Sequence, residues 1–227
     1  MAIWALPADL EQADDALVEA IDAALRAGAR RAGSHLACRL GCTECCIGVF
    51  DITALDAARL TRGMATLHRS DPGRTRRLVE RARVHWESLA PAFPGDRRSG
   101  GLAEDEARRA KLFARHADLP CPALDPQTGA CELYTWRPLT CRNFGLPVRF
   151  GAEVVPPCRL NFTAASAVEV ETATVDPDPD DAEGRLLGRL RDSGEPAADT
   201  VVAFVLARAG DALRPSRRAP RRRGGPR

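Results

Sequence analysis

The chain has 227 residues and a formal net charge of +2, and eight of its residues are cysteines. Only 5% of the residues are aromatic, so the core must be built mainly from Ala, Leu and Val, which favours helices. The longest apolar stretch, 201–207, is far shorter than the roughly 20 residues that span a bilayer, and the N-terminus lacks the pattern of a signal peptide. We therefore expect a cytoplasmic protein without a membrane partner, in which clustered cysteines bind metal or act as catalytic thiols.

The first half of the chain is dominated by helical periodicity. Helices are predicted from residue 10 to a stop near Gly28 and Gly33, and at residues 53–67, 72–89 and 104–117. The second of these begins with Thr53, followed three residues later by Asp56, which resembles a capping box.

Four cysteines lie between the first two helices, in the pattern Cys38-x3-Cys42-x2-Cys45-Cys46. Short turns of this kind deliver two or three thiolates from one loop to a tetrahedral zinc ion or an iron–sulfur cluster. Successive side chains normally diverge, so Cys45 and Cys46 should not both face one small ion. We expect one of them to join Cys38 and Cys42, and the other to face a second metal or a distal cysteine.

The other four cysteines lie further along the chain. Cys121 and Cys131 flank a turn at 126–129, which predicts a small β-hairpin with facing ligands. Cys141 lies in a helix start or tight turn at 137–142, and Cys158 follows. Each metal site is therefore predicted to bridge residues 38–46 and residues 121–158.

After residue 162, a strand is predicted around 168–170, an acidic proline-rich linker at 176–183, and helices at 186–190 and 197–213. The last fourteen residues contain seven arginines and no acid. Such a tail is expected to be disordered, although it also suits binding to nucleic acid or to an acidic partner.

The predicted fold is mainly α with a small β-hairpin and irregular loops, in a single cysteine-rich, metal-centred domain with a C-terminal helical extension. The expected boundaries are an N-terminal helix at 1–34, a metal-binding domain at 35–162, a linker with C-terminal helices at 163–213, and the tail at 214–227.

The cysteines coincide with further residues in one pattern. After the first motif come Cys121-Pro122-x-Leu124-Asp125, Gly129-x-Cys131-x-x-Tyr134-x-x-Arg137-Pro138-x-x-Cys141-Arg142-x-Phe144 and Cys158. Over residues 35–162 the chain thus resembles the CxxxCxxCC cysteine-cluster family of zinc- or iron-chelating domains. The resemblance implies metal binding. Within that family, flagellin lysine N-methylases use S-adenosylmethionine together with an iron–sulfur cluster, so the resemblance also allows S-adenosylmethionine as a cofactor.

Ligation by cysteine alone suits both zinc and iron–sulfur clusters. An iron–sulfur cluster is favoured, because the resemblance implies one by analogy with the flagellin lysine N-methylases and because six aromatic residues near the cysteines could shield it from water. They are Phe50, Tyr134, Trp136, Phe144, Phe150 and Phe162. Packing of a small core explains them equally well.

Two arginines, Arg137 and Arg142, flank Cys141. Their charge would offset a thiolate cluster or hold a carboxylate or phosphate, and Tyr134 could donate a hydrogen bond to a sulfur or a substrate, which makes these three residues candidates for cofactor binding. The alternative for the arginines is a structural ion pair with Asp125 or Glu132.

Three functions fit the sequence. The leading one is a metal-binding accessory or redox protein, followed by a cluster-dependent S-adenosylmethionine methyltransferase and by a zinc-stabilised interaction module. The spacing of the first three cysteines also matches radical S-adenosylmethionine enzymes, but residues 51–117 lack the alternating strands of their barrel.

Overall fold

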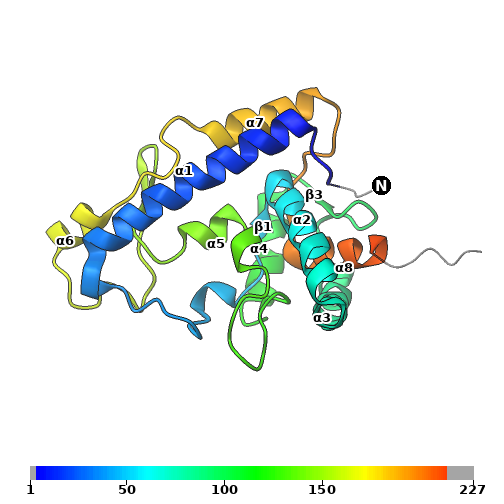
Figure 1. Cartoon of the computed structure of the whole chain (residues 1–227), viewed down its shortest axis with the longest axis horizontal. Coiled ribbons are helices and arrows are strands. Elements are labelled where there is room, and N and C mark those ends of the chain that lie inside the picture. The colour runs from blue at the N-terminus through cyan, green and yellow to red at the C-terminus, as the bar shows by residue number, and fades with distance from the viewer. Residues whose placement is uncertain (1–3, 214–227) are drawn as a thin grey trace, which may run out of the picture.

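The computed structural model describes residues 4–213, and the arginine-rich tail predicted to be disordered lies outside this range. The fold is mainly helical, as the sequence predicts (Figure 1). The helices are α1 (Ala8–Ala32), α2 (Ala54–Ser70), α3 (Pro72–Leu89), α4 (Glu106–Arg115), α5 (Leu139–Asn143), α6 (Ala167–Ala173), α7 (Ala182–Asp192) and α8 (Val202–Ala212). In this part of the chain no helix has the length and apolar character needed to cross a membrane.

The longest helix is α1, which packs against α5, α6 and α7 (Figure 1). Its buried face carries Leu10, Leu17, Ile21 and Leu25, at the spacing that predicts a helix here. The helix continues past Gly28 and stops at Gly33, the second of the two glycines near which its end is predicted, and the φ of 52° at Gly33 suits glycine.

A second layer is formed by α2, α3 and α8, which pack against one another. The predicted capping box at the start of α2 is present, because the Thr53 side chain accepts a hydrogen bond from the Asp56 amide and the Asp56 carboxylate accepts one from the Thr53 amide. At the α3–α8 contact, Gly210 lies so close to Val79 that a β-carbon would come within 2.4 Å of that side chain.

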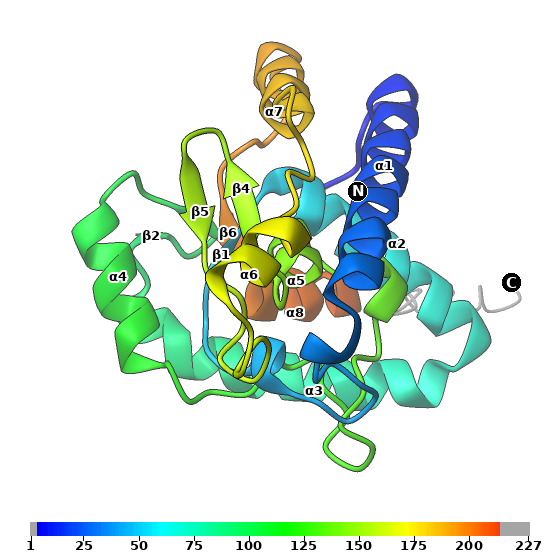
Figure 2. The ribbon, with the colours of Figure 1, turned by 90° about the vertical axis from the view of Figure 1, so that its left-hand side faces the viewer.

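The β-structure consists of three antiparallel pairs of short strands. They are β1 (Asp51–Ile52) with β6 (Thr200–Val201), β2 (Gly95–Asp96) with β3 (Gly101–Leu102), and β4 (Val148–Phe150) with β5 (Glu153–Val155). The predicted hairpin around Cys121 and Cys131 is reduced to one isolated bridge, between Leu124 and Cys131. A hairpin forms instead at β4–β5, which lies beside α6 because Val148 pairs with Val175 (Figure 2).

Two predictions for the C-terminal part are corrected. The strand expected around 168–170 is the helix α6, since Ser166 and Glu169 form a capping box that outweighs the β-branched valines. The helix expected from 197 begins only at Val202, because Thr200 and Val201 pair with β1. The acidic segment before α7 has a structural role, as the Asp178 carboxylate accepts hydrogen bonds from the amides of Ala182 and Glu183.

Candidate metal centre

The end of the first cysteine motif is a 3₁₀ turn at Glu44–Cys46, closed by a hydrogen bond from the Cys46 amide to the Thr43 carbonyl. The Sγ atoms of Cys45 and Cys46 are 3.9 Å apart. The expected divergence of these neighbouring side chains is therefore not seen, because the tight turn brings both sulfurs to one side.

The two cysteine regions meet through their backbones. The Cys121 amide donates to the Cys46 carbonyl at 2.6 Å, and the Gly48 amide donates to the Leu119 carbonyl at 2.9 Å. The bridge between Leu124 and Cys131 then places Cys131 next to the same turn. Residues 38–46 and 121–131 are thus joined directly.

Five cysteines have shifted pKa values to which another cysteine of the same set contributes, and we call them the inner group: Cys45, Cys46, Cys121, Cys131 and Cys141. The hydrogen bond from the Cys46 thiol lowers the pKa of Cys45 to about 6, and the same bond together with burial raises the pKa of Cys46. Burial raises the pKa of Cys121 to about 12 and raises the pKa values of Cys131 and Cys141. One thiolate among mainly neutral thiols is the arrangement that limits repulsion between like charges.

The remaining cysteines have other neighbours. Cys38 is exposed, and its Sγ accepts a hydrogen bond from Asn161 Nδ2 at 3.4 Å. The same amide group donates to the Gly145 carbonyl, which also accepts from the Cys158 amide at 3.2 Å. Cys42 closes its turn through a bond from its amide to the Arg39 carbonyl. We call Cys38, Cys42 and Cys158 the outer cysteines.

Each distal cysteine of the inner group is followed by a residue that is anchored to a helix. The Pro122 carbonyl accepts from Arg81 Nε at 3.0 Å. The buried Glu132 carboxylate accepts from Arg74 Nε at 2.6 Å and also from Arg81, so α3 holds both Cys121 and Cys131. These anchors could not be identified from sequence, because Arg74 and Glu132 are 58 positions apart.

Cys141 is anchored in the same way by the next residue, Arg142. This buried guanidinium donates to Asp22 Oδ2 of α1 at 2.6 Å and to the Arg137 carbonyl at 3.1 Å. The structural ion pair considered from sequence is therefore formed, but with Asp22 instead of Asp125 or Glu132. Among the outer cysteines, Cys158 is followed by Arg159, which pairs with Glu44 at 2.8 Å.

Arg137 and Tyr134, predicted with Arg142 to bind a cofactor, lie together. The Arg137 guanidinium is 4.0 Å from the centre of the Tyr134 ring and donates to the Tyr134 carbonyl. Its charge lowers the pKa of Cys45, although less than the Cys46 thiol does. Tyr134 is 63% exposed. Binding of S-adenosylmethionine or another cofactor by these residues stays a prediction.

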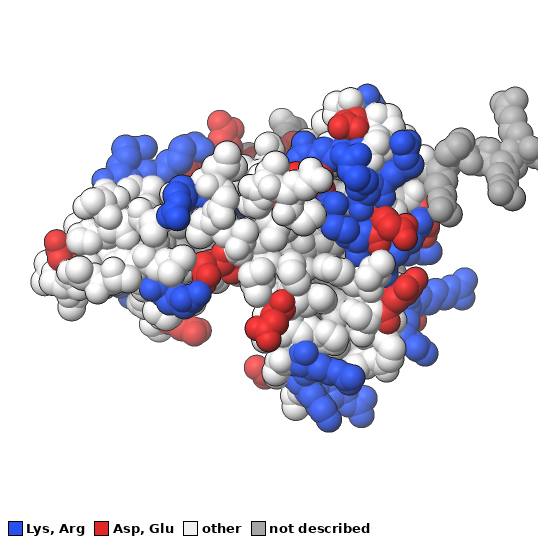
Figure 3. Space-filling model, turned by 90° about the horizontal axis from the view of Figure 1, so that it is seen from below, with Lys and Arg blue, Asp and Glu red and all other residues white. Residues whose placement is uncertain are grey.

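The aromatic residues near the cysteines do not form one closed wall. Tyr134, Phe144 and Phe150 are exposed, while Phe162 is buried and stacks on His35 with ring centres 5.6 Å apart. Figure 3 shows the side of the molecule on which the loop after α1 emerges, and here a broad uncharged surface lies between groups of charged side chains.

The inner group fits a thiophilic metal by the chemistry of its donors, which are all sulfur. Within residues 4–213, however, no three His, Cys, Asp or Glu side chains are arranged around one point as the ligands of an ion. Binding would therefore require thiol rotation and proton loss.

Comparison with known proteins gives one match. A family model, CxxCxxCC, described as a "Putative zinc- or iron-chelating domain", covers residues 37–159, which is more than half of the chain. No curated protein and no solved structure matches the chain. The matched segment begins just before Cys38 and ends just after Cys158, so it contains all eight cysteines.

Proposed function

The chain belongs to the CxxCxxCC family of zinc- or iron-chelating domains, and we propose that its inner group of cysteines holds an iron–sulfur cluster in an accessory or redox protein. Metal binding itself follows from the family. Zinc in the same place is the second candidate, since thiolates bind both.

The observation that supports this proposal is the backbone contact between Cys46 and Cys121, which joins the two cysteine regions. An iron–sulfur cluster and a structural zinc ion each take four cysteine ligands, so the five thiols of the inner group could supply either. Such a cluster would supply one-electron transfer, whereas zinc would only tie the loops together.

The protein contributes position and charge. The anchors Arg81, Glu132 and Arg142 fix the backbone beside three of the thiols. Arg137 places a positive charge where the thiolates of a loaded centre would accumulate negative charge. The outer cysteines stay predicted ligands, of this centre or of a second one.

Anaerobic purification followed by analysis of iron, sulfide and zinc tests the proposal. Iron and sulfide in similar amounts, with a broad visible absorption band, are expected for a cluster. Colourless protein that contains only zinc would instead establish the second candidate, and protein that binds neither metal would refute both.

The variant Cys121→Ser should lose the metal, because Cys121 belongs to the inner group. Cys38→Ser is the comparison variant, since it makes the same change at an exposed outer cysteine. Retention of the metal in this variant would place Cys38 outside the centre, and loss of the metal would make Cys38 a ligand as well. Full metal content in Cys121→Ser would show that the inner group is wrongly assigned.

A further inference from the structure

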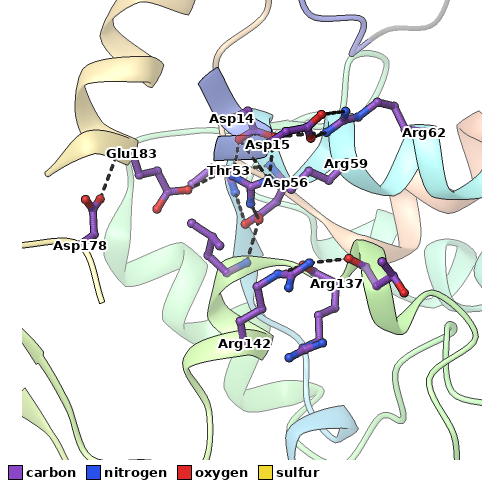
Figure 4. A network of polar contacts seen from close by, with 12 residues as sticks. Asp14, Asp15, Thr53, Asp56, Arg59, Arg62, Arg137, Arg142, Asp178 and Glu183 are labelled. Atoms are coloured by element: carbon purple, nitrogen blue, oxygen red, sulfur yellow. Dashed lines mark hydrogen bonds and ion pairs between the residues drawn. The ribbon is translucent and has the colours of Figure 1, made fainter. Parts of the chain in front are cut away.

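Three ionisable side chains are buried together between α1 and α2. Asp14 of α1 and Asp56 and Arg59 of α2 are each at most 1% exposed (Figure 4). Arg59 Nε donates to Asp14 Oδ2 at 2.9 Å, and its Nη1 donates to Asp56. Burial raises the pKa of Asp56, while the charge of Arg59 acts against this rise.

Burial of such a group costs free energy of folding. Removing charges from water costs several kcal/mol per ion, and an apolar replacement of similar volume is often as stable. A buried triad is therefore weak evidence for stability alone, and what else its members contact is informative.

Asp56 has one contact that the rest of the triad lacks. Its Oδ1 accepts a hydrogen bond from the Leu139 amide at 2.8 Å. Leu139 is the first residue of α5, and the preceding Pro138 provides no side-chain cap for that helix. Asp56 thus supplies from another helix the acceptor that a capping residue normally provides.

The hydrogen bond between Asp56 and the Leu139 amide lies two residues before Cys141. The short helix α5 carries Cys141 between two tertiary ties, Asp56 at Leu139 and Asp22 at Arg142. The turn before it is also fixed, because Trp136 packs so closely on Gly63 of α2 that a β-carbon there would lie 2.5 Å from the ring. The backbone that presents Cys141 is therefore set by α1 and α2.

We propose that Asp56 is a positioning residue of the metal centre: it aims Cys141 through the Leu139 amide, while its ion pair with Arg59 holds its carboxylate in place. The proposal rests on the proposed function, because it assigns a role toward the metal that the inner group holds. Loss of a residue that holds a metal ligand in place typically weakens metal affinity by about 10–100-fold.

The test uses full-length protein with Zn²⁺ in competition with a chelator, and Co²⁺ as a spectroscopic probe. Asp56→Ala should weaken Zn²⁺ affinity by about 10–100-fold and change the sulfur-to-Co²⁺ charge-transfer band. Asp56→Asn, which keeps an oxygen acceptor for Leu139, should recover most of the affinity. A role limited to the charge that Asp56 offers Arg59 would not produce this rescue, because Asn is neutral.

Asp14→Asn is the matched control, since it disturbs the same buried arginine without touching α5. It should lower thermal stability as Asp56→Ala does. Its Zn²⁺ affinity should stay within about twofold of the wild type, a much smaller change than loss of a residue that positions a ligand would cause. If Asp56→Ala and Asp14→Asn lost affinity equally, or if neither lost affinity, the positioning role would be overturned. Wild-type protein with no sulfur-to-Co²⁺ band and no metal would instead refute the proposed function.

Amide hydrogen exchange in the wild-type protein decides the question if Asp56→Ala does not fold. Leu139 and Thr140 both lie in the first turn of α5, where amides lack helical partners. With the bond to Asp56, the Leu139 amide should exchange at least about tenfold more slowly than that of Thr140. Equal exchange rates would show that Asp56 does not hold this amide.

Discussion

At the scale of single residues, buried and half-buried carboxylates determine how the helices hold the cysteine loops. Glu132, Asp56 and Asp22 each accept hydrogen bonds from arginines or amides distant in the sequence. Glu183 belongs to the same buried region, where its Oε1 accepts a hydrogen bond from Thr53 Oγ1 at 3.0 Å. Unlike the others, it has no arginine at hydrogen-bond distance in the described residues.

Glu183 should make the stability of the protein depend on pH. Burial and the charge of Asp56 raise its pKa from 4.5 to about 7, although Arg59 and the hydrogen bond from Thr53 act against this rise. The folded state therefore holds the proton more tightly than the unfolded chain, and stability falls as the pH rises from 4.5 to about 7.

Replacing Glu183 with Gln should flatten this part of the stability profile, and urea unfolding measured across the interval would show it. Glu171→Gln serves as the control, because its exposed pair with Arg149 should leave the profile of the wild type unchanged. A profile of equal slope in wild type and Glu183→Gln would contradict the assignment.

At the scale of elements, close contacts form where a glycine in a helix leaves room for a neighbouring side chain. Gly210 of α8 faces Val79 of α3, and Gly63 of α2 faces Trp136 in the turn before α5. The first contact forms the α2–α3–α8 layer, and the second fixes the turn that leads to Cys141. Close packing thus extends from the helical layer to the metal-binding loops.

Gly210→Ala should destabilise the protein. Overpacking against Val79 costs about 1–3 kcal/mol, which exceeds the gain of up to about 1 kcal/mol from better helix propensity. Gly188→Ala in α7 is the control and should stabilise the protein. The new β-carbon has room there, because the nearest atom, on the Arg191 side chain, is 3.9 Å away. Chemical denaturation of both variants would measure the difference, and stabilisation by Gly210→Ala would show that the α3–α8 contact is looser than described.

At the scale of the whole molecule, the inner group joins parts of the chain that the helices separate. Cys45 and Cys46 precede α2, Cys121 and Cys131 follow α4, and Cys141 lies in α5. A metal held there would connect the loop after α1 to the loops on both sides of residue 131. Because the proposed ligands come from distant segments, we expect metal binding and folding to be coupled.

Removal of the metal should lower the melting temperature. A metal present at about 100 times its Kd stabilises a folded protein by about 2.7 kcal/mol, which corresponds to roughly 5–10 °C for a chain of this size. Thermal unfolding under reducing conditions, with and without a strong chelator, would measure the change. An unchanged melting temperature after verified metal loss would contradict the coupling of the centre to the fold.

Much of the fold could be predicted from local patterns. The long first helix follows from the spacing of Leu10, Leu17 and Ile21, and the start of α2 follows from Thr53 and Asp56. Family membership follows from the ordered cysteines. The wrong strand at 168–170 shows the limit of local patterns. The valines there predict a strand, whereas the capping box of Ser166 and Glu169 starts a helix.

The candidate site was predictable only in part. The meeting of the two cysteine regions was expected, but the closeness of the Cys45 and Cys46 sulfurs was not, because it depends on the tight turn that they occupy. The anchors of the distal cysteines carry no local signal. The domain boundaries, the ligand set and the cytoplasmic location stay predictions.

The sequence by itself determined the helical character of the protein, its family and the kind of ligand it offers, because hydrophobic periodicity, capping and cysteine spacing act over a few residues. Only the tertiary structure decided which thiols gather and which side chains hold them. Partners such as Asp56 and Leu139, 83 positions apart, meet because the packing of whole helices brings them together.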